Sequence, residues 1–475
     1  MIINNLYSQK YDKNVPINSN GVILDFFASL RNFQPMILCV ALFFFIYIPI
    51  ISLIPFLLYL QINESLSVNK KSKLVNIYDS KKHKKPLKWD TIVILIICVL
   101  VLSIYNSTIF VYSDTAVYLR WFTDILNLNF SESLDYLRIY NQEPMTLMTI
   151  KYIVLFLGFD ANSFLLISAL FLNSSFIIIT YKVVPKYYPI IILINVLSVG
   201  YYNQLFYFRQ TVSFVFVIMF LFTENKFLSS SLFLLTFNTH SSSLLLFPVL
   251  FLKLGSGKFK IIDNFLKSNR IKSILVLILI ISLISLILFR TQILNFVLSF
   301  ISTFGNEPLR RRADLYLRNE GSSFQGGQTF LFLNSFIFIF YILKVDFKNH
   351  LNSLKNNPLL YSLIGYFIVL MIGLFVVIFA GFNFRLVYFL TSLNGFFYLI
   401  PIISHQIQRK NTQYYLFLSQ IILGCGIFIR NLFREHSTDF SLFLQERVGQ
   451  VTFWEARPLD ADLFDYIKHF INVVS

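Results

Sequence analysis

Polar side chains that could do chemistry stand at the borders of long apolar stretches in this chain. They comprise Asp114, Tyr118, Glu143, Arg209, Gln210, His240, Arg310, Arg311, Arg312, Arg385 and Tyr388. An ionisable group beside the hydrocarbon of a membrane costs about 2.5 to 3.5 kcal/mol on insertion scales, so such groups often mark a ligand path. Arginines suit an anionic ligand, and carboxylates or a histidine can serve as general bases.

Arginines surrounded by apolar segments fit one ligand especially well, a polyprenyl pyrophosphate. Guanidinium forks bind its phosphates, and an apolar lateral entry admits its tail. Sugar transfer from such a donor needs a carboxylate to take the proton of the acceptor hydroxyl and cations to stabilise the departing pyrophosphate. The same residues would also suit a transporter of carboxylate substrates, or ion pairs between helices.

Each candidate residue also has a purely structural interpretation. Asp114 follows Ser113 before a helical pattern and would cap that helix. His240 would hydrogen-bond a broken helix, and Arg209 and Arg385 would snorkel to the headgroups. The arginines at 310–312 would bind anionic lipid on a solvated loop. The chain has no glycine-rich phosphate loop and no metal-ligand spacing, so we expect neither a cofactor nor a metal.

The composition defines the class of protein that must position these residues. Of 475 residues, 56% are hydrophobic and only 13% are charged, which is too apolar for an ordinary soluble domain. We expect an all-α, polytopic helical bundle with 10–12 transmembrane helices, some of them broken or re-entrant. The net charge of +16 then reports membrane topology and indicates no nucleic-acid partner.

Lysine placement predicts the sidedness of the bundle. The lysines between residues 61 and 90 are the strongest cytoplasmic signal, and the uncharged interval 32–63 before them reads as one span. The N-terminus and the C-terminal tail would then lie outside. The expected division is a polar N-terminal extension at 1–35, a membrane domain at 36–430 with outer loops at 114–143 and 290–320, and an outer tail at 431–475.

Two irregular segments decide the side on which Arg209 lies. The stretch 144–159 carries Lys151, and the run 227–252 is interrupted by the polar residues around His240. If both cross the membrane there are twelve spans and Arg209 faces the cytoplasm. If both are re-entrant or broken there are ten, and Arg209 faces outside. The second topology is preferred, because Lys151 and the His240 cluster are what a segment lining a cavity would carry.

Taken together, the chain resembles the EpsG-like group of bacterial polysaccharide polymerases, often called Wzy-type. The likeness rests on Asp114 to Tyr118, Glu143-Pro144, Arg209-Gln210, His240-Ser241, and Arg385 with Tyr388. It implies a GT-C-like glycosyltransferase of the bacterial cytoplasmic membrane, independent of metals and nucleotides, that joins undecaprenyl-pyrophosphate-linked repeat units at the outer face. By analogy Arg209 and Arg385 would hold pyrophosphate, and Asp114 would be the base.

Other functions remain open at this stage. A flippase for lipid-linked oligosaccharides would need charges along a path through both halves of the protein, whereas here they gather on one side. Another membrane transferase is also possible, either an O-antigen ligase or an acyltransferase that uses His240 as its base. The expected partners are lipid-linked glycans, membrane lipid and a chain-length regulator.

Overall fold

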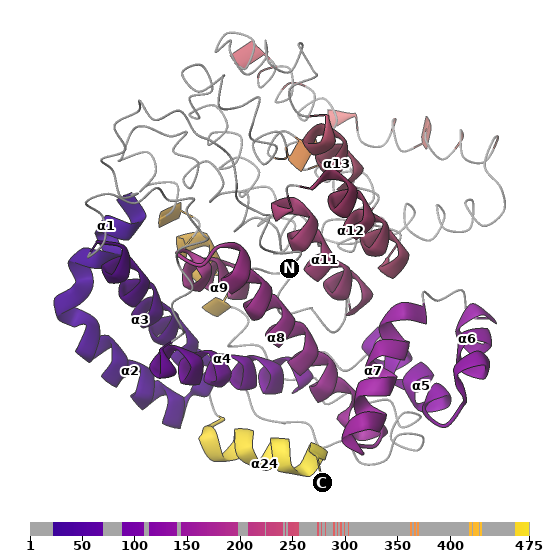
Figure 1. Cartoon of the computed structure of the whole chain (residues 1–475), viewed down its shortest axis with the longest axis horizontal. Helices are drawn as coiled ribbons and strands as arrows, with labels where there is room; N and C mark the ends of the chain where they lie inside the picture. Colours follow the sequence, from indigo (N-terminus) through magenta and orange to yellow (C-terminus); the bar gives the residue numbers. More distant parts are fainter. Residues whose placement is uncertain are drawn as a thin grey trace. The chain divides into compact units, whose positions relative to one another are not determined.

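The computed structural model describes residues 22–69, 88–108, 114–139, 144–197, 208–223, 225–240, 246–255 and 461–474, with further scattered positions between 243 and 429. Every regular element in this part of the chain is a helix (Figure 1), as predicted. The elements are α1 (Val22–Ser29), η2 (Leu30–Phe33), α2 (Gln34–Tyr47), α3 (Pro49–Asn69), α4 (Trp89–Thr108), α5 (Asp114–Leu126), α6 (Phe130–Ile139), α7 (Pro144–Leu157), η4 (Ala161–Ser163), α8 (Phe164–Val183), α9 (Tyr188–Val196), α11 (Phe208–Phe222), α12 (Lys226–Thr239), α13 (Phe247–Leu254) and α24 (Leu463–Val474).

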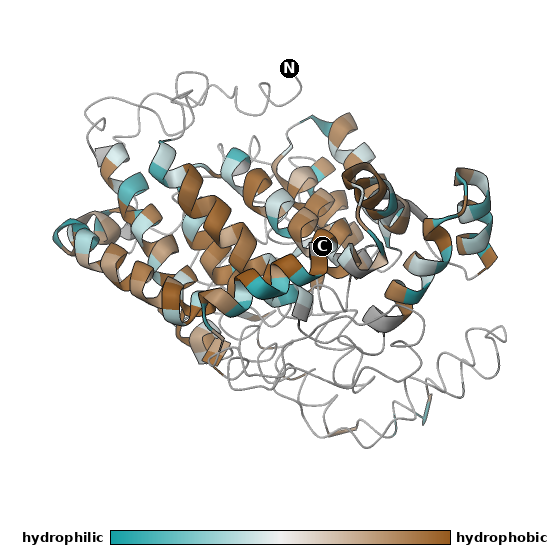
Figure 2. Ribbon diagram, turned by 90° about the horizontal axis from the view of Figure 1, so that it is seen from below, coloured by the Kyte–Doolittle hydropathy of each residue, from teal (hydrophilic) through white to brown (hydrophobic). Residues whose placement is uncertain are grey.

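The chain forms two compact units. The first comprises Met1–Ser243 and Gly424–Ser475, and the second comprises Leu244–Leu423 and contains α13. Among the described residues, four helical stretches, all in the first unit, are long and apolar enough to cross a membrane: Leu24–Tyr47, Pro49–Ser67, Trp89–Ser107 and Phe164–Lys182. Figure 2 shows hydrophobic residues, in brown, along much of the helical ribbon. The expected helical membrane bundle is confirmed.

The N-terminal region differs from the prediction of a single span over 32–63. The helix α2 ends at Tyr47, and α3 starts at Pro49, a residue suited to the first position of a helix because its missing N–H would have no partner there. The two helices pack together, and Gln34 Nε2 donates to Asn63 Oδ1 at 2.6 Å. They therefore form an antiparallel hairpin, and the residues before Gln34 lie beside the end of α3. The interval 32–63 therefore holds two helices and not the predicted single span, while the side of the membrane expected for the N-terminus and the boundary expected at residue 35 stay predictions.

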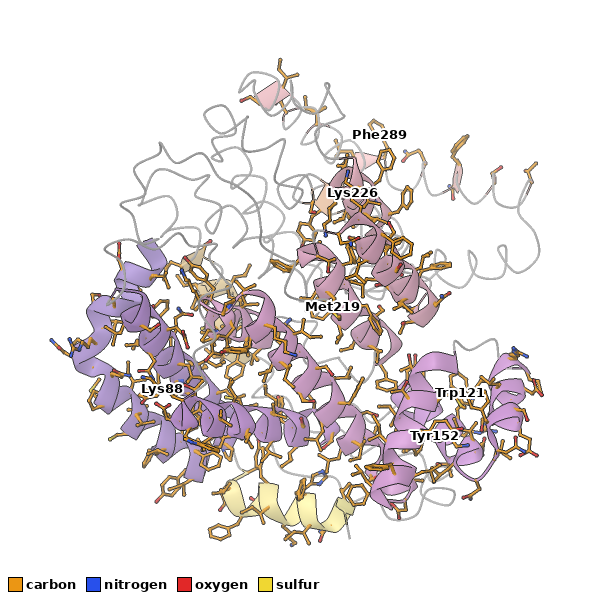
Figure 3. All side chains as sticks on the ribbon, viewed as in Figure 1. Lys88, Trp121, Tyr152, Met219, Lys226 and Phe289 are labelled. Carbon is orange, nitrogen blue, oxygen red and sulfur yellow. The ribbon has the colours of Figure 1, made fainter. Side chains whose placement is uncertain are left out.

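One end of the first unit collects lysines, and we call it the basic end. The helix α3 runs towards the lysine-rich segment that begins at Lys70. Gln61 of α3 donates to the backbone oxygen of Lys186 at 3.1 Å, just after α8 ends. Lys88, which precedes α4 and is labelled in Figure 3, lies close enough to Glu64 near the end of α3 for their charges to interact. The end of α3, the start of α4 and the end of α8 thus share the basic end.

The opposite end of the same unit, which we call the distal end, is where α4 stops and α8 starts. The helices α4 and α8 pack together, with Asn173 Nδ2 donating to Ser103 Oγ at 3.2 Å. Near the end of α4, Ser107 Oγ lies 3.3 Å from His469 Nε2 of α24, and α24 also packs on η4. Because η4 leads directly into α8, α4 and α8 are antiparallel. The segment 109–113 then leads from the distal end into α5.

The helices α8 and α11 run in the same direction. Their first residues, Phe164 and Phe208, have ring centroids 5.7 Å apart, and further along Phe176 and Phe214 lie 6.0 Å apart. Contacts in the same order along both helices require a parallel arrangement. Since α8 starts at the distal end, α11 also starts there.

The helix α12 returns antiparallel to α11. A short connection at 223–225 joins them, Asn225 caps α12 by accepting from Leu228 N at 3.1 Å, and Ser229 Oγ donates to Phe220 O at 3.1 Å. The two helices have 15 and 14 residues, so they are about 21–23 Å long, which is shorter than the roughly 30 Å hydrocarbon core. The end of α12 therefore comes back to the level at which α11 starts.

Candidate functional site

Arg209 and Gln210 are the second and third residues of α11, and the structure places their backbone at the distal end. Their neighbour Phe208 is fully buried, and its ring fixes the start of the helix against α8. The side chains of Arg209 and Gln210 lie outside the described residues. The N-terminus of a helix carries the positive pole of its dipole and unpaired N–H groups, so both α8 and α11 present ends that favour an anion at the distal end.

The start of α5 meets the start of α11. Asp114 is the first residue of α5, although its side chain is outside the described set. One turn later, Tyr118 is 5% exposed, and its ring centroid lies 6.0 Å from that of Phe208 and 5.8 Å from that of Trp121. Trp121 is labelled in Figure 3. The structure thus brings the chain around Asp114 close to the chain around Arg209.

An apolar cluster joins the helices that begin here. It includes Tyr118 of α5, Met148 of α7, Phe164 of α8 and Phe208 of α11. Glu143 directly precedes Pro144, the first residue of α7, where a proline is well suited because its missing N–H would have no partner. Glu143 itself lies outside the described residues. One apolar core therefore joins three helices. These are α5, which starts at Asp114, α7, which follows Glu143, and α11, which has Arg209 as its second residue.

His240 marks the break expected in the run 227–252. The helix α12 ends at Thr239, and His240 is extended, with φ −161° and ψ 123°. Its N–H still donates to Thr236 O at 3.1 Å, and its own carbonyl accepts from Ser243 N at 3.1 Å. His240 is half-buried and follows the last residue of α12, the end of that helix that lies at the same end of the unit as the start of α11. Among the sequence candidates, the remaining arginines, 310–312 and 385, and Tyr388 lie outside the described residues.

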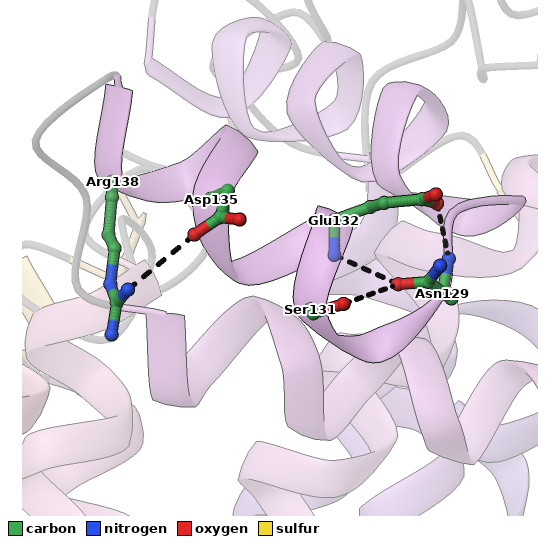
Figure 4. A network of polar contacts seen from close by, with 5 residues as sticks. All are labelled: Asn129, Ser131, Glu132, Asp135 and Arg138. Atoms are coloured by element: carbon green, nitrogen blue, oxygen red, sulfur yellow. Dashed lines mark hydrogen bonds and ion pairs between the residues drawn. The ribbon is translucent and has the colours of Figure 1, made fainter.

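The predicted outer loop 114–143 contains a helical hairpin, α5 and α6. Asn129 Oδ1 accepts from Glu132 N at 2.9 Å, and Glu132 Oε2 accepts from Asn129 N at 3.0 Å (Figure 4). This reciprocal arrangement is a capping box, and it starts α6. Tyr136 hydrogen-bonds Asp124 and ties the two helices together. The exposed pair Arg138–Asp135 at 3.5 Å, also drawn in Figure 4, adds little stability.

Lys151 does not line a cavity, and here the sequence interpretation needs correction. Its side chain is 1% exposed, and Nζ donates to Ile125 O at 2.7 Å, Leu128 O at 2.5 Å and Ser133 Oγ at 2.8 Å. The ammonium group therefore caps the C-terminal end of α5, where the helix dipole favours a cation. Lys151 is a structural residue that fixes α7 to the α5–α6 hairpin.

Tyr118, a predicted substrate-binding residue, is buried in the apolar cluster, which leads to a test of its role. Tyr118→Ala removes a buried ring and should destabilise the protein by about 3–5 kcal/mol. Tyr118→Phe keeps the ring contacts and is expected to retain most of that stability and to leave polymer length unchanged. The measurements are the thermal midpoint in detergent and the length distribution of the polysaccharide. Loss of polymer from a Tyr118→Phe protein of normal stability would instead support the glycan contact that the sequence predicted.

The described side chains give no sign of a metal centre. Within that part of the chain, no three His, Cys, Asp or Glu side chains come together as metal ligands would. Independence from metals and nucleotides stays a prediction.

Comparison with known protein families places the chain in one of them. A sequence profile of the EpsG family matches residues 87–444, which is well over half of the chain. No curated protein and no solved structure matches. The matched segment runs from the start of α4 through all the candidate site residues and supports a polysaccharide-polymerase type of role in a multi-pass membrane protein. The chain belongs to the EpsG family.

Proposed function

We propose that this protein polymerises undecaprenyl-pyrophosphate-linked repeat units into a polysaccharide at the outer face of the bacterial cytoplasmic membrane. The observation that carries the proposal is the shared direction of α8 and α11. It puts the start of α11, with Arg209, at the end of the first unit opposite the lysines. Family membership supports the general activity.

The side of the membrane follows from the positive-inside rule. Lys88 and Lys186 stand at the basic end, and the lysine-rich run that begins at Lys70 lies between α3 and α4 in the sequence. Because basic residues are retained in the cytoplasm, the distal end faces outside. Arg209, the start of α5 with Asp114, and the break at His240 then lie on the outer side. This assignment supports the topology in which Arg209 faces outside.

The proposed roles follow from the chemistry of the reaction. Arg209 and Arg385 hold the pyrophosphate of the donor, with 310–312 as further cationic contacts. The positive end of the α11 dipole adds to the attraction for phosphate. As pyrophosphate leaves, these cations stabilise the developing charge.

A base must take the proton of the attacking sugar hydroxyl. Asp114 is the proposed base, and Glu143 and His240 are the other candidates. Gln210 and Tyr388 supply hydrogen bonds to the glycan. Bond formation at the sugar carbon and departure of the pyrophosphate carrier then occur without a metal.

The decisive test is to delete the gene and analyse the lipid-linked glycans. We expect single repeat units to accumulate on the polyprenyl carrier at the outer face, where externally added glycosidase can reach them. Repeat units that stay inaccessible until the membrane is opened would show a flippase and defeat the proposal. Long polymer that remains on the carrier would indicate a ligase, and polymer of normal length that lacks an acyl group would indicate an acyltransferase.

A further inference from the structure

The C-terminal helix α24 divides its surface into three sectors. One sector is buried and includes Tyr466, His469 and Val473. A second is apolar but exposed. It consists of Phe464, Ile467 and Ile471, whose exposed fractions are 74%, 46% and 55%. The third is polar and exposed and consists of Asp465, Lys468 and Asn472. At 3.6 residues per turn, each set falls on its own side of the helix.

The buried sector attaches α24 to the distal end of the first unit. The helix contacts α2, α4 and η4, and His469 reaches Ser107 near the end of α4. A helix of 12 residues that touches three different elements at one end of a bundle lies across them. At about 18 Å it is also too short to cross a membrane.

The helices that α24 packs against also expose apolar side chains. The helices α2 and α4, on which α24 packs, are candidate membrane spans, and they leave Phe43, Tyr47 and Ile96 among the exposed large hydrophobic residues. A reciprocal cap starts α24, since Asp465 N donates to Asp462 Oδ1 and Asp462 N donates to Asp465 Oδ2, each at 3.0 Å. The helix thus packs on protein with one sector, exposes apolar side chains in the second, and carries polar and charged side chains in the third.

We propose that α24 is an interfacial membrane helix. Its apolar sector, Phe464, Ile467 and Ile471, inserts among the acyl chains of the leaflet at the distal end, while its polar sector faces water. Its buried sector seals the bundle at the end of α4. The helix lies beyond residue 444, where the family match ends, and the proposal does not depend on the reaction that the protein catalyses.

The test is nitroxide scanning of α24 in the full-length protein, reconstituted in vesicles of phosphatidylcholine and phosphatidylglycerol. Cys39, Cys98 and Cys425, the free cysteines, are first replaced by alanine. Single labels are then placed at 464, 467 and 471, and, as matched controls on the same helix, at 465, 468 and 472. Accessibility to oxygen, which concentrates in lipid, is compared with accessibility to a water-soluble nickel chelate.

We expect oxygen to dominate at 464, 467 and 471, corresponding to a depth of about 5–10 Å below the headgroups. The chelate is expected to dominate at 465, 468 and 472. Equal or greater access of the chelate at the apolar sector would show that it faces water and overturn the proposal. Low access of both reagents there would show a protein cover, such as a second copy of the chain, and would also overturn it. All six labels sit on exposed positions. The label at 465 removes one half of the reciprocal cap, so the labels at 468 and 472, which leave the cap intact, are the decisive controls.

Discussion

Replacing Arg209 with alanine is expected to abolish long polymer while the protein remains inserted at its normal level. Arg209 stands at the start of α11, at the distal end of the first unit. Removing a cation that stabilises a departing pyrophosphate should lower the rate by roughly 100-fold or more, as does loss of a single preorganised donor in other enzymes. The measurement is polymer length and amount in a deletion strain that carries the variant, with protein quantified in the membrane fraction.

Two further variants make this result specific. Arg209→Lys keeps the charge but loses the planar fork, so we expect a partial defect between those of alanine and wild type. Arg31→Ala removes an exposed arginine beside the start of α2, at the basic end, and should leave the polymer unchanged. If Arg209→Ala makes polymer of normal length, Arg209 takes no part in the site. Equal loss in Arg31→Ala would point to a general effect of basic charge on insertion.

The helical class and the position of the break at His240 could be predicted from the sequence, because both depend on local composition. Apolar runs of sufficient length predict spans, and a cluster of serine, threonine and asparagine around a histidine predicts an interruption. The N-terminal hairpin could not be predicted from the lengths of the uncharged intervals, because no charged residue separates its two helices. Its turn at Ile48-Pro49 lies inside an uncharged interval, and a proline alone does not mark the reversal, since Pro55 of the same interval lies inside α3.

The side on which Arg209 lies needed contacts that the sequence does not contain. Counting apolar runs left two topologies, since short segments such as α7 and α12 can either cross or return. Two pairs of phenylalanine rings, 164 with 208 and 176 with 214, fix α11 parallel to α8. That relation joins positions about 40 residues apart, so no local pattern reveals it. Because α8 and α11 are parallel, the lysines that follow α8 lie at the end of the unit opposite Arg209, and they therefore bear on the side of the membrane that Arg209 faces.

The role of Lys151 was hidden for a different reason. A lysine within an apolar stretch has the same sequence signature whether it lines a wet cavity or caps a neighbouring helix. The useful signal lay elsewhere, in Asn129 and Glu132, whose spacing predicts the capping box that starts α6. A hairpin in the loop 114–143 creates a helix end with unpaired carbonyls, and a nearby buried cation is a natural partner for them.

Lys151→Met is therefore expected to lower stability first and activity only as a consequence. Methionine retains most of the side-chain volume but leaves Ile125 O, Leu128 O and Ser133 Oγ without their charged donor. Hydrogen bonds to charged groups contribute about 1.5–3 kcal/mol each, and part of this is offset because a buried ammonium no longer has to be desolvated. We expect a net loss of about 3 kcal/mol, seen as a lower thermal midpoint of the purified protein in detergent.

A matched control separates this structural role from a catalytic one. Lys226→Met replaces an exposed lysine at the first position of α12, so its thermal midpoint should stay at the wild-type value. If Lys151→Met keeps the wild-type midpoint yet makes no polymer, Lys151 would act on the substrate as a cavity-lining residue. If instead the midpoint falls and polymer synthesis recovers at low temperature, the ammonium serves to hold α7 against the α5–α6 hairpin. The helices α5, α7 and α11 share one apolar core. The hydrogen bonds of Lys151 to the hairpin would then help to position the start of α5, with Asp114, relative to the start of α11, with Arg209.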